Sequence, residues 1–167
     1  MDDQQQAAER WGEGPPLVGI LCGSASDLPV MKQATAILER FNVPHELRVI
    51  SAHRNPDAVD EYARTAEERG FVCLIAGAGM ANHLGGAVAA RTVLPVIGVP
   101  LSGSNLAGAD ALYSTVQMPK GVPVATVAID GAMNAAILAV QILAVRDKEV
   151  RHLLYEFKDS LAEGFRL

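Results

Sequence analysis

Short apolar or alternating runs and longer amphipathic segments follow one another along most of the 167-residue chain. Each run is short enough for a strand and leads into a polar or glycine-containing loop, whereas the longer segments repeat apolar residues at helical spacing. The predicted strands are Leu17–Cys22, His45–Ile50, Phe71–Ala76, Pro95–Val99 and Val122–Val127. The predicted helices are Leu28–Phe41, Asp57–Arg69, Met80–Arg91, Asp110–Val116, Ala132–Val145 and Asp147–Leu161.

This alternation of strands and helices predicts a parallel sheet covered by helices on both faces. About five strands in such an arrangement favour a flavodoxin-like, doubly wound three-layer α/β sandwich. We expect a single domain over residues 16–167, because no linker interrupts the pattern and the length suits one hydrophobic core. Residues 1–15 are mostly polar and acidic, and we expect them to form a flexible tail.

The last two predicted helices differ in character. Ala132–Val145 is almost entirely apolar, so it must be buried on several sides, which indicates packing between subunits. Asp147–Leu161 is charged on one face and apolar on the other, and we expect it to pack on a neighbouring subunit. Both features predict a homo-oligomer.

The composition of the chain indicates the cellular compartment. No apolar stretch approaches the roughly 18 residues that a membrane helix needs, and the first residues lack the basic start and apolar stretch of a secretory signal. Cys22 and Cys73 lie inside apolar blocks, where a thiol behaves as a small hydrophobe rather than as part of a disulfide framework. We therefore expect a cytoplasmic protein that does not bind membranes.

Charge and motif spacing limit the classes of ligand that we expect the protein to bind. The net charge is −5 and no Lys or Arg cluster stands out, so we expect no nucleic-acid binding. The chain has no CxxC or HExxH spacing, and we predict no metal site. A small molecule is the expected partner, and an anionic one would require a locally positive pocket.

Three polar loops follow predicted strands, at the edge where doubly wound sheets bind ligands. The first contains Ser24, Ser26 and Asp27 before a helix. Its hydroxyls and backbone amides suit a phosphate and its carboxylate suits sugar hydroxyls, although the same residues are also common helix caps.

The second loop is Ser51–Pro56, which places the imidazole of His53 beside the guanidinium of Arg54. Arginine can bind a phosphate with two hydrogen bonds, and histidine exchanges protons near neutral pH. An exposed His-Arg pair before a helix is often only a solvated cap. Its position after a strand favours a functional site.

The third loop, Gly77–Gly86, brings backbone close to a ligand at Gly77 and Ala78 and supplies the side chains of Asn82 and His83. It is not a dinucleotide-binding fingerprint, because Asn82 stands where a third glycine is required. His83 equally suits a hydrogen-bonded helix residue. The two other histidines, His45 and His152, are interpreted as structural.

Taken in order, these motifs resemble the PurE family of purine-biosynthesis enzymes, whose members carry GSxSD, SAHRTP and AHLPGM-type loops. The likeness covers roughly Val18–Val145. The counterparts here are Gly23–Asp27, Ser51–Pro56 and Asn82–Ala87, with further matches at Leu94–Pro100, Val116–Val124 and Asn134–Ala136.

The resemblance implies a flavodoxin-like subunit in a homo-octamer with active sites where subunits meet. It implies an isomerase of de novo IMP biosynthesis, which converts N5-carboxyaminoimidazole ribonucleotide (N5-CAIR) to 4-carboxyaminoimidazole ribonucleotide (CAIR). Carbon dioxide would leave nitrogen and be recaptured at carbon, with no metal, ATP or organic cofactor. An imidazole suits the proton transfers that this requires.

The resemblance also implies roles for residues. His53 and His83 would be catalytic, with His53 as the general acid and base. Ser24 and Asp27 would hold the ribose, while the phosphate would be bound by Ser26, Ser51 and Arg54. The other expected substrate-binding residues are Gly77, Ala78, Asn82 and Leu84.

Several positions depart from the family pattern. Asn82, with a Leu two residues later, resembles the loop of the family's other branch, the aminoimidazole ribonucleotide (AIR) carboxylases, which take carbon dioxide directly. His83 and the intact GSxSD loop instead favour the mutase. Direct carboxylation is therefore the first alternative; a pyridine-mononucleotide carboxylase and a non-catalytic nucleotide-binding module are the others. The remaining departures are Asn55 for Thr, Met80 for Gly, Gly85 for Pro and Ala87 for Met.

Overall fold

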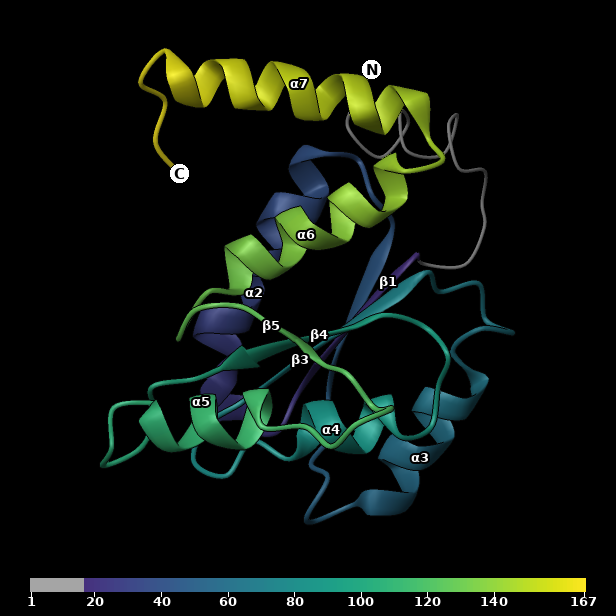
Figure 1. The fold of residues 1–167 in the computed structure, drawn as a ribbon, viewed down its shortest axis with the longest axis vertical. Coiled ribbons are helices and arrows are strands. Elements are labelled where there is room, and N and C mark those ends of the chain that lie inside the picture. Colours follow the sequence, from purple (N-terminus) through teal and green to yellow (C-terminus); the bar gives the residue numbers. More distant parts are fainter. Residues whose placement is uncertain (1–16) are drawn as a thin grey trace.

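The computed structural model describes residues 17–167, and the tail predicted over residues 1–15 lies outside this range. The described chain forms a five-stranded parallel sheet in the order β2-β1-β3-β4-β5, with helices on both faces (Figure 1). This is the strand order of flavodoxin-like folds, which confirms the predicted fold class. The strands are β1 Val18–Cys22, β2 His45–Val49, β3 Cys73–Ala78, β4 Val96–Pro100 and β5 Ala125–Thr126.

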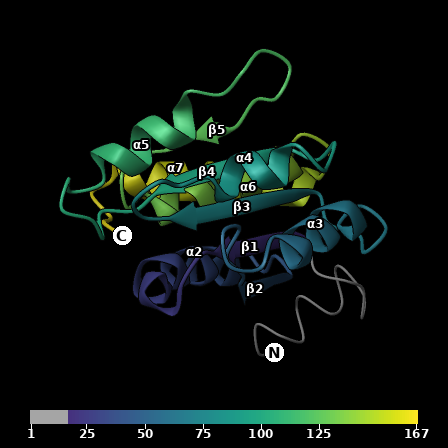
Figure 2. The same ribbon diagram turned by 90° about the horizontal axis from the view of Figure 1, so that it is seen from below.

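The helices form the two outer layers. In Figure 1, α2 and α6 lie above the sheet, α3, α4 and α5 lie below it, and α7 packs on the outer side of α6. Figure 2 shows the same layers from below. The helices are the short 3-10 turn η1 Ala25–Asp27, α2 Leu28–Arg40, α3 Pro56–Thr65, α4 Leu84–Ala89, α5 Ala109–Val116, α6 Ala132–Ala144 and α7 Lys148–Ala162.

The inner strands explain the apolar runs in the sequence. Every residue of β1 and β4 is buried, because helices cover both faces of the sheet there. Alternate residues enter two separate cores: Ile20 and Ile75 pack with α2, α6 and α7, whereas Leu21 and Leu74 pack with α3 and α4. The edge strand β2 has no fully buried residue, which agrees with its mixed sequence.

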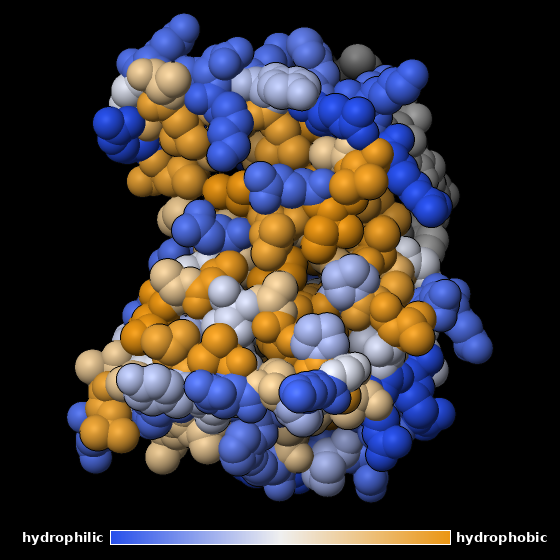
Figure 3. Space-filling view, in the orientation of Figure 1, coloured by the Kyte–Doolittle hydropathy of each residue, from blue (hydrophilic) through white to orange (hydrophobic). Residues whose placement is uncertain are grey.

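Helix α6 is buried mainly by its own chain. It lies between α2, the sheet and α7, and its buried residues include Ala135, Ala139 and Val140. The apolar face of α7 also packs within the chain, where the Phe157 ring meets Phe41 edge-on at 5.5 Å. Part of the apolar surface remains uncovered in a single chain, as the orange band between α7 and α5 in Figure 3 shows. Packing of α7 on a neighbouring subunit stays a prediction.

Several predicted boundaries were wrong. The helix expected over Asp57–Arg69 ends at Thr65. Strand β3 continues through Gly77 and Ala78, which were expected in a loop, because both pair with β4. The helix expected over Met80–Arg91 covers only Leu84–Ala89, since Met80 has a left-handed backbone. The fifth strand has two residues rather than the six of Val122–Val127, because Pro123 has no N–H to donate to a ladder.

Candidate active site

The loops that follow β1, β2, β3 and β4 surround one cleft at the carboxyl edge of the sheet. Its volume is about 540 Å³. Ligand sites of doubly wound sheets lie at this edge, so topology brings the three polar loops of the sequence together. The lining residues are Gly23, Ser24, Ser26, Asp27, Ser51, Ala52, His53, Arg54, Ala78, Gly79, Met80, Ala81, Leu84 and Gly103.

The first loop forms a small hydroxyl cluster. The Ser26 hydroxyl donates to Ser24 Oγ over 2.9 Å, and Ser24 Oγ also accepts from the backbone N–H of Ser26. Ser24 thus caps the turn η1. Both hydroxyls are in the cleft wall, where they can also meet an anionic group.

Asp27 stands at the N-cap position of α2, yet its side chain makes no capping hydrogen bond. The carboxylate lines the cleft instead. Burial raises the pKa of Asp27, against the lowering effect of hydrogen bonds with Ser24 and Ser26 and of the Arg54 charge. A partly desolvated carboxylate that is free of a capping role suits sugar hydroxyls.

The second loop orients Arg54. Its guanidinium donates from Nη2 to the carbonyl oxygen of Gly23 over 2.7 Å, which ties the second loop to the first. The Arg54 backbone N–H donates to Ser51 Oγ over 3.3 Å. A guanidinium carries five N–H donors, so the others remain available for an anion.

Asn55 has a separate task. Its Oδ1 accepts from the backbone N–H of Ala58 and caps α3, and Pro56 follows in the first turn. The substitution of Asn for Thr at this position therefore exchanges one good capping residue for another. The cap fixes the start of α3 immediately after His53 and Arg54.

The third loop brings His83 to His53. His53 Nε2 and His83 Nδ1 are 2.9 Å apart, and the two rings meet edge-on with centroids 5.0 Å apart. One nitrogen donates and the other accepts. The alternative for His83 was a hydrogen-bonded helix residue; it stands at the N-cap position of α4, and its side chain makes no capping hydrogen bond to that helix.

Two of the expected substrate-binding residues lie behind the cleft wall. Asn82 is fully buried, its Nδ2 donates to the carbonyl oxygen of Val99 over 3.2 Å, and its Oδ1 has no hydrogen-bond partner. Gly77 lies against the side chain of Met31, and a Cβ at this position would collide with it. By contrast, Ala78 and Leu84 line the cleft.

Sequence reasoning missed several lining residues, among them Gly79, Met80 and Gly103. Gly103 belongs to the loop after β4, and its neighbour Ser102 is held by a hydrogen bond from its N–H to Asp130 Oδ1 over 2.9 Å. The signal that could have found it is positional: the loop follows a strand next to β3 in a doubly wound sheet. Met80 was noted only as a departure from the family pattern.

The remaining histidines lie away from the cleft lining. His45 Nδ1 is 2.9 Å from the carbonyl oxygen of Val43, and His152 Nε2 is 3.4 Å from Glu156 on the exposed face of α7. Within residues 17–167, no group of three or more His, Cys, Asp or Glu side chains has a metal-binding arrangement. No helix in the same range is long and apolar enough to cross a membrane.

Comparisons with known proteins identify relatives over most of the chain. The AIR carboxylase family model matches residues 17–164. The chain is 56% identical over 148 residues to the N5-carboxyaminoimidazole ribonucleotide mutase of Pyrococcus abyssi, covering 89% of this chain and 85% of that protein. It is 57% identical to the mutase of Thermotoga maritima, covering 87% of this chain and 85% of that one.

Two further comparisons add context. The phosphoribosylaminoimidazole carboxylase of Schizosaccharomyces pombe is 56% identical over 89% of this chain, but the match covers only 27% of that longer protein. Among solved structures, PurE of Treponema denticola superposes with a TM-score of 0.80 at 33% identity, covering 89% of this chain and 92% of that one. These matches extend over most of the described chain.

Proposed function

The chain belongs to the AIR carboxylase (PurE) family, and from this premise we propose that it is an N5-carboxyaminoimidazole ribonucleotide mutase. The proposed reaction converts N5-CAIR to CAIR in purine biosynthesis. The observation that carries it is the contact of His83 with His53, which lines a cleft that also presents Arg54 and the three serines Ser24, Ser26 and Ser51.

The imidazole pair can carry out the proton transfers that the reaction requires. When the bond between nitrogen and the carboxylate carbon breaks, the nitrogen takes up a proton. When C4 forms its bond to the same carbon, C4 loses a proton. His53 can give the first proton and take the second, so the reaction is balanced without an external acid or base, and His83 Nδ1 holds the ring in position.

The polar groups of the cleft suit a ribonucleotide. We propose that Arg54, Ser26 and Ser51 bind the phosphate and that Ser24 and Asp27 bind the ribose. Arg54 lines the cleft, and its fixed guanidinium favours a charge-assisted contact with phosphate. The expected contacts of Gly77 and Asn82 would be indirect, through the backbone that these residues hold in place.

The mutase is favoured over direct carboxylation by the relatives of similar length. The chain covers 82–85% of the mutases of Pyrococcus abyssi, Pyrococcus horikoshii and Thermotoga maritima, whereas it covers 24–27% of the fungal carboxylases. The buried position of Asn82 also supports the mutase, because its amide bonds to Val99 rather than lining the cleft. Direct use of carbon dioxide is the alternative outcome of the test below.

We propose that the protein works as a homo-octamer in the cytoplasm. The apolar band between α7 and α5 supports assembly, since it stays uncovered in a single chain. Val116 of α5 is also exposed. Cys22 and Cys73 are buried free thiols, and burial raises their pKa values to about 11 and about 12 respectively. Inert thiols of this kind agree with a reducing compartment.

The test supplies purified protein with N5-CAIR, and separately with AIR and bicarbonate, and follows CAIR. We expect rapid CAIR formation from N5-CAIR and little from AIR at low bicarbonate. Turnover of AIR and bicarbonate alone would contradict the proposal and favour the direct carboxylase. Absence of CAIR from both mixtures would contradict both activities.

A further inference from the structure

Met80 is a cleft residue with a left-handed backbone. Its φ is +55°, a region that glycine adopts freely and that side chains with a Cβ disfavour. Among residues 17–167, the other non-glycine residues with positive φ are Asn42, Ala107 and Asp130, and none of these lines the cleft. Strained backbone conformations cluster at functional sites, so the Met80 side chain is a candidate for a role in the cleft.

Hydrogen bonds on both sides of Met80 hold this conformation. The Ala78 carbonyl oxygen accepts from the N–H of Leu101 over 3.0 Å. On the other side, the N–H of Asn82 donates to Ser114 Oγ over 2.9 Å. The chain between these anchors must turn sharply, and glycine would make the same turn without strain. The backbone therefore does not explain why a methionine stands here.

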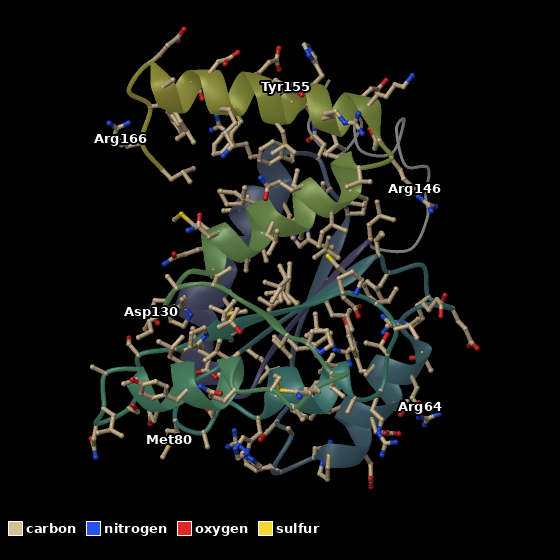
Figure 4. All side chains as sticks on the ribbon, in the orientation of Figure 1. Arg64, Met80, Asp130, Arg146, Tyr155 and Arg166 are labelled. Carbon is tan, nitrogen blue, oxygen red and sulfur yellow. The ribbon has the colours of Figure 1, made fainter. Side chains whose placement is uncertain are left out.

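The Met80 side chain is unusually open for a large apolar group. It is 66% exposed, and it lines the cleft together with Leu84 and His53. In Figure 4 the labelled Met80 side chain projects from the lower edge of the ribbon. A thioether on a flexible chain adapts its shape to what it contacts, so it can close over a small apolar molecule beside the imidazole.

We propose that Met80 favours transfer of carbon dioxide to C4 over its release into solvent. Its side chain would form the apolar wall that keeps the freed carbon dioxide beside C4. This inference rests on the proposed mutase activity. In that reaction the nitrogen–carbon bond breaks, carbon dioxide forms without net charge, and C4 bonds to it while His53 moves the proton. Carbon dioxide offers little for polar groups to hold, so an apolar wall that excludes water is the suitable barrier to its escape.

The experiment compares Met80→Gly, Met80→Asn and Met80→Leu with the natural protein. Each is given N5-CAIR, and the ratio of AIR to CAIR is measured after subtracting spontaneous decay. Asn and Gly tolerate the backbone but remove the apolar bulk, so we expect the ratio to rise about tenfold, as for a lost apolar contact in a pocket. Met80→Leu keeps the bulk and should leave the ratio near that of the natural protein.

Ala107→Gly is the matched control for backbone strain. Ala107 has a φ of +50° and does not line the cleft. Both glycine variants should raise Tm by about 2–4 °C, but only Met80→Gly should change the product ratio. An unchanged ratio in Met80→Gly and Met80→Asn, or an equal rise in Ala107→Gly, would overturn the inference while the mutase activity stands. If the natural protein forms no CAIR from N5-CAIR, the proposed function fails, and the inference fails with it.

Discussion

His53 Nε2 lies 2.9 Å from His83 Nδ1, although the two residues are thirty positions apart in the chain. The contact exists because the loops after β2 and β3 end at the same edge of one parallel sheet, with β1 between these strands. A pair of imidazoles in contact can share one proton and orient each other's rings. This relationship is the centre of the proposed proton transfer.

Replacing His53 by Asn should abolish the proton transfer and leave nucleotide binding intact. The amide is similar in size and keeps hydrogen-bonding capacity but cannot accept a proton at neutral pH. We expect kcat for CAIR formation to fall by about 10²–10⁴-fold. Stopped-flow or discontinuous assay gives kcat, and calorimetry with CAIR gives the Kd.

His83→Asn is the paired comparison. If His83 orients His53, its loss should lower kcat less than the loss of His53 and should change the pH dependence of kcat/KM. Normal turnover in His53→Asn would remove that residue from the mechanism. A larger loss in His83→Asn than in His53→Asn would reverse their roles.

Arg54→Ala should weaken nucleotide binding. Loss of one charge-assisted phosphate contact typically costs about 1.5–3 kcal/mol, equivalent to a rise in Kd of roughly 10–150-fold. Arg54→Lys keeps the charge but loses the planar guanidinium that donates to the Gly23 carbonyl, so it should recover only part of the affinity. Calorimetry with CAIR measures both variants, and unchanged affinity in Arg54→Ala would place the phosphate elsewhere.

Asp27→Asn should make the protein more stable at neutral pH. Burial raises the pKa of Asp27, so its folded-state pKa lies above its unfolded one and the natural protein loses stability as pH rises through that value. The uncharged amide avoids this loss. Thermal unfolding should therefore show a higher Tm for Asp27→Asn at pH 7, with the difference vanishing below about pH 4, the ordinary range of Asp. A lower Tm for the variant at pH 7 would contradict this account.

Asn82→Ala tests whether the buried amide is structural. The substitution leaves the Val99 carbonyl oxygen without its side-chain donor, and such losses cost about 1–3 kcal/mol. We expect urea unfolding to show a decrease of that size in the free energy of unfolding. Unchanged stability together with weaker binding of CAIR would instead place the Asn82 amide in contact with the substrate.

The sequence predicted the layers better than the contacts between them. Continuous apolar runs located β1 and β4 to within a residue or two, because strands covered on both faces are apolar throughout. Strand β3 was placed too early, because Gly77 and Ala78 at its end were interpreted as loop residues. Both belong to the strand, and the small size of Gly77 serves packing against Met31.

The site was predictable in outline for a different reason. Parallel topology places every loop after a strand at one edge, so His53, Arg54 and Asp27 could be expected near one another. The sequence does not determine whether the side chain of a loop residue points into the cleft or into the core. Asn82 is therefore buried against Val99, although its type suggested a ligand contact. Met80 lines the cleft, although it was expected only as the first residue of a helix and as a departure from the family pattern.

The most direct test of intramolecular carboxylate transfer uses N5-CAIR with ¹³C in its carboxylate, in the presence of excess unlabelled bicarbonate. We predict that the CAIR formed early in the reaction retains the ¹³C label, because C4 captures the carbon dioxide before it leaves the cleft. Mass spectrometry of the product measures the label. CAIR that carries mainly unlabelled carbon from the first turnovers would contradict the account.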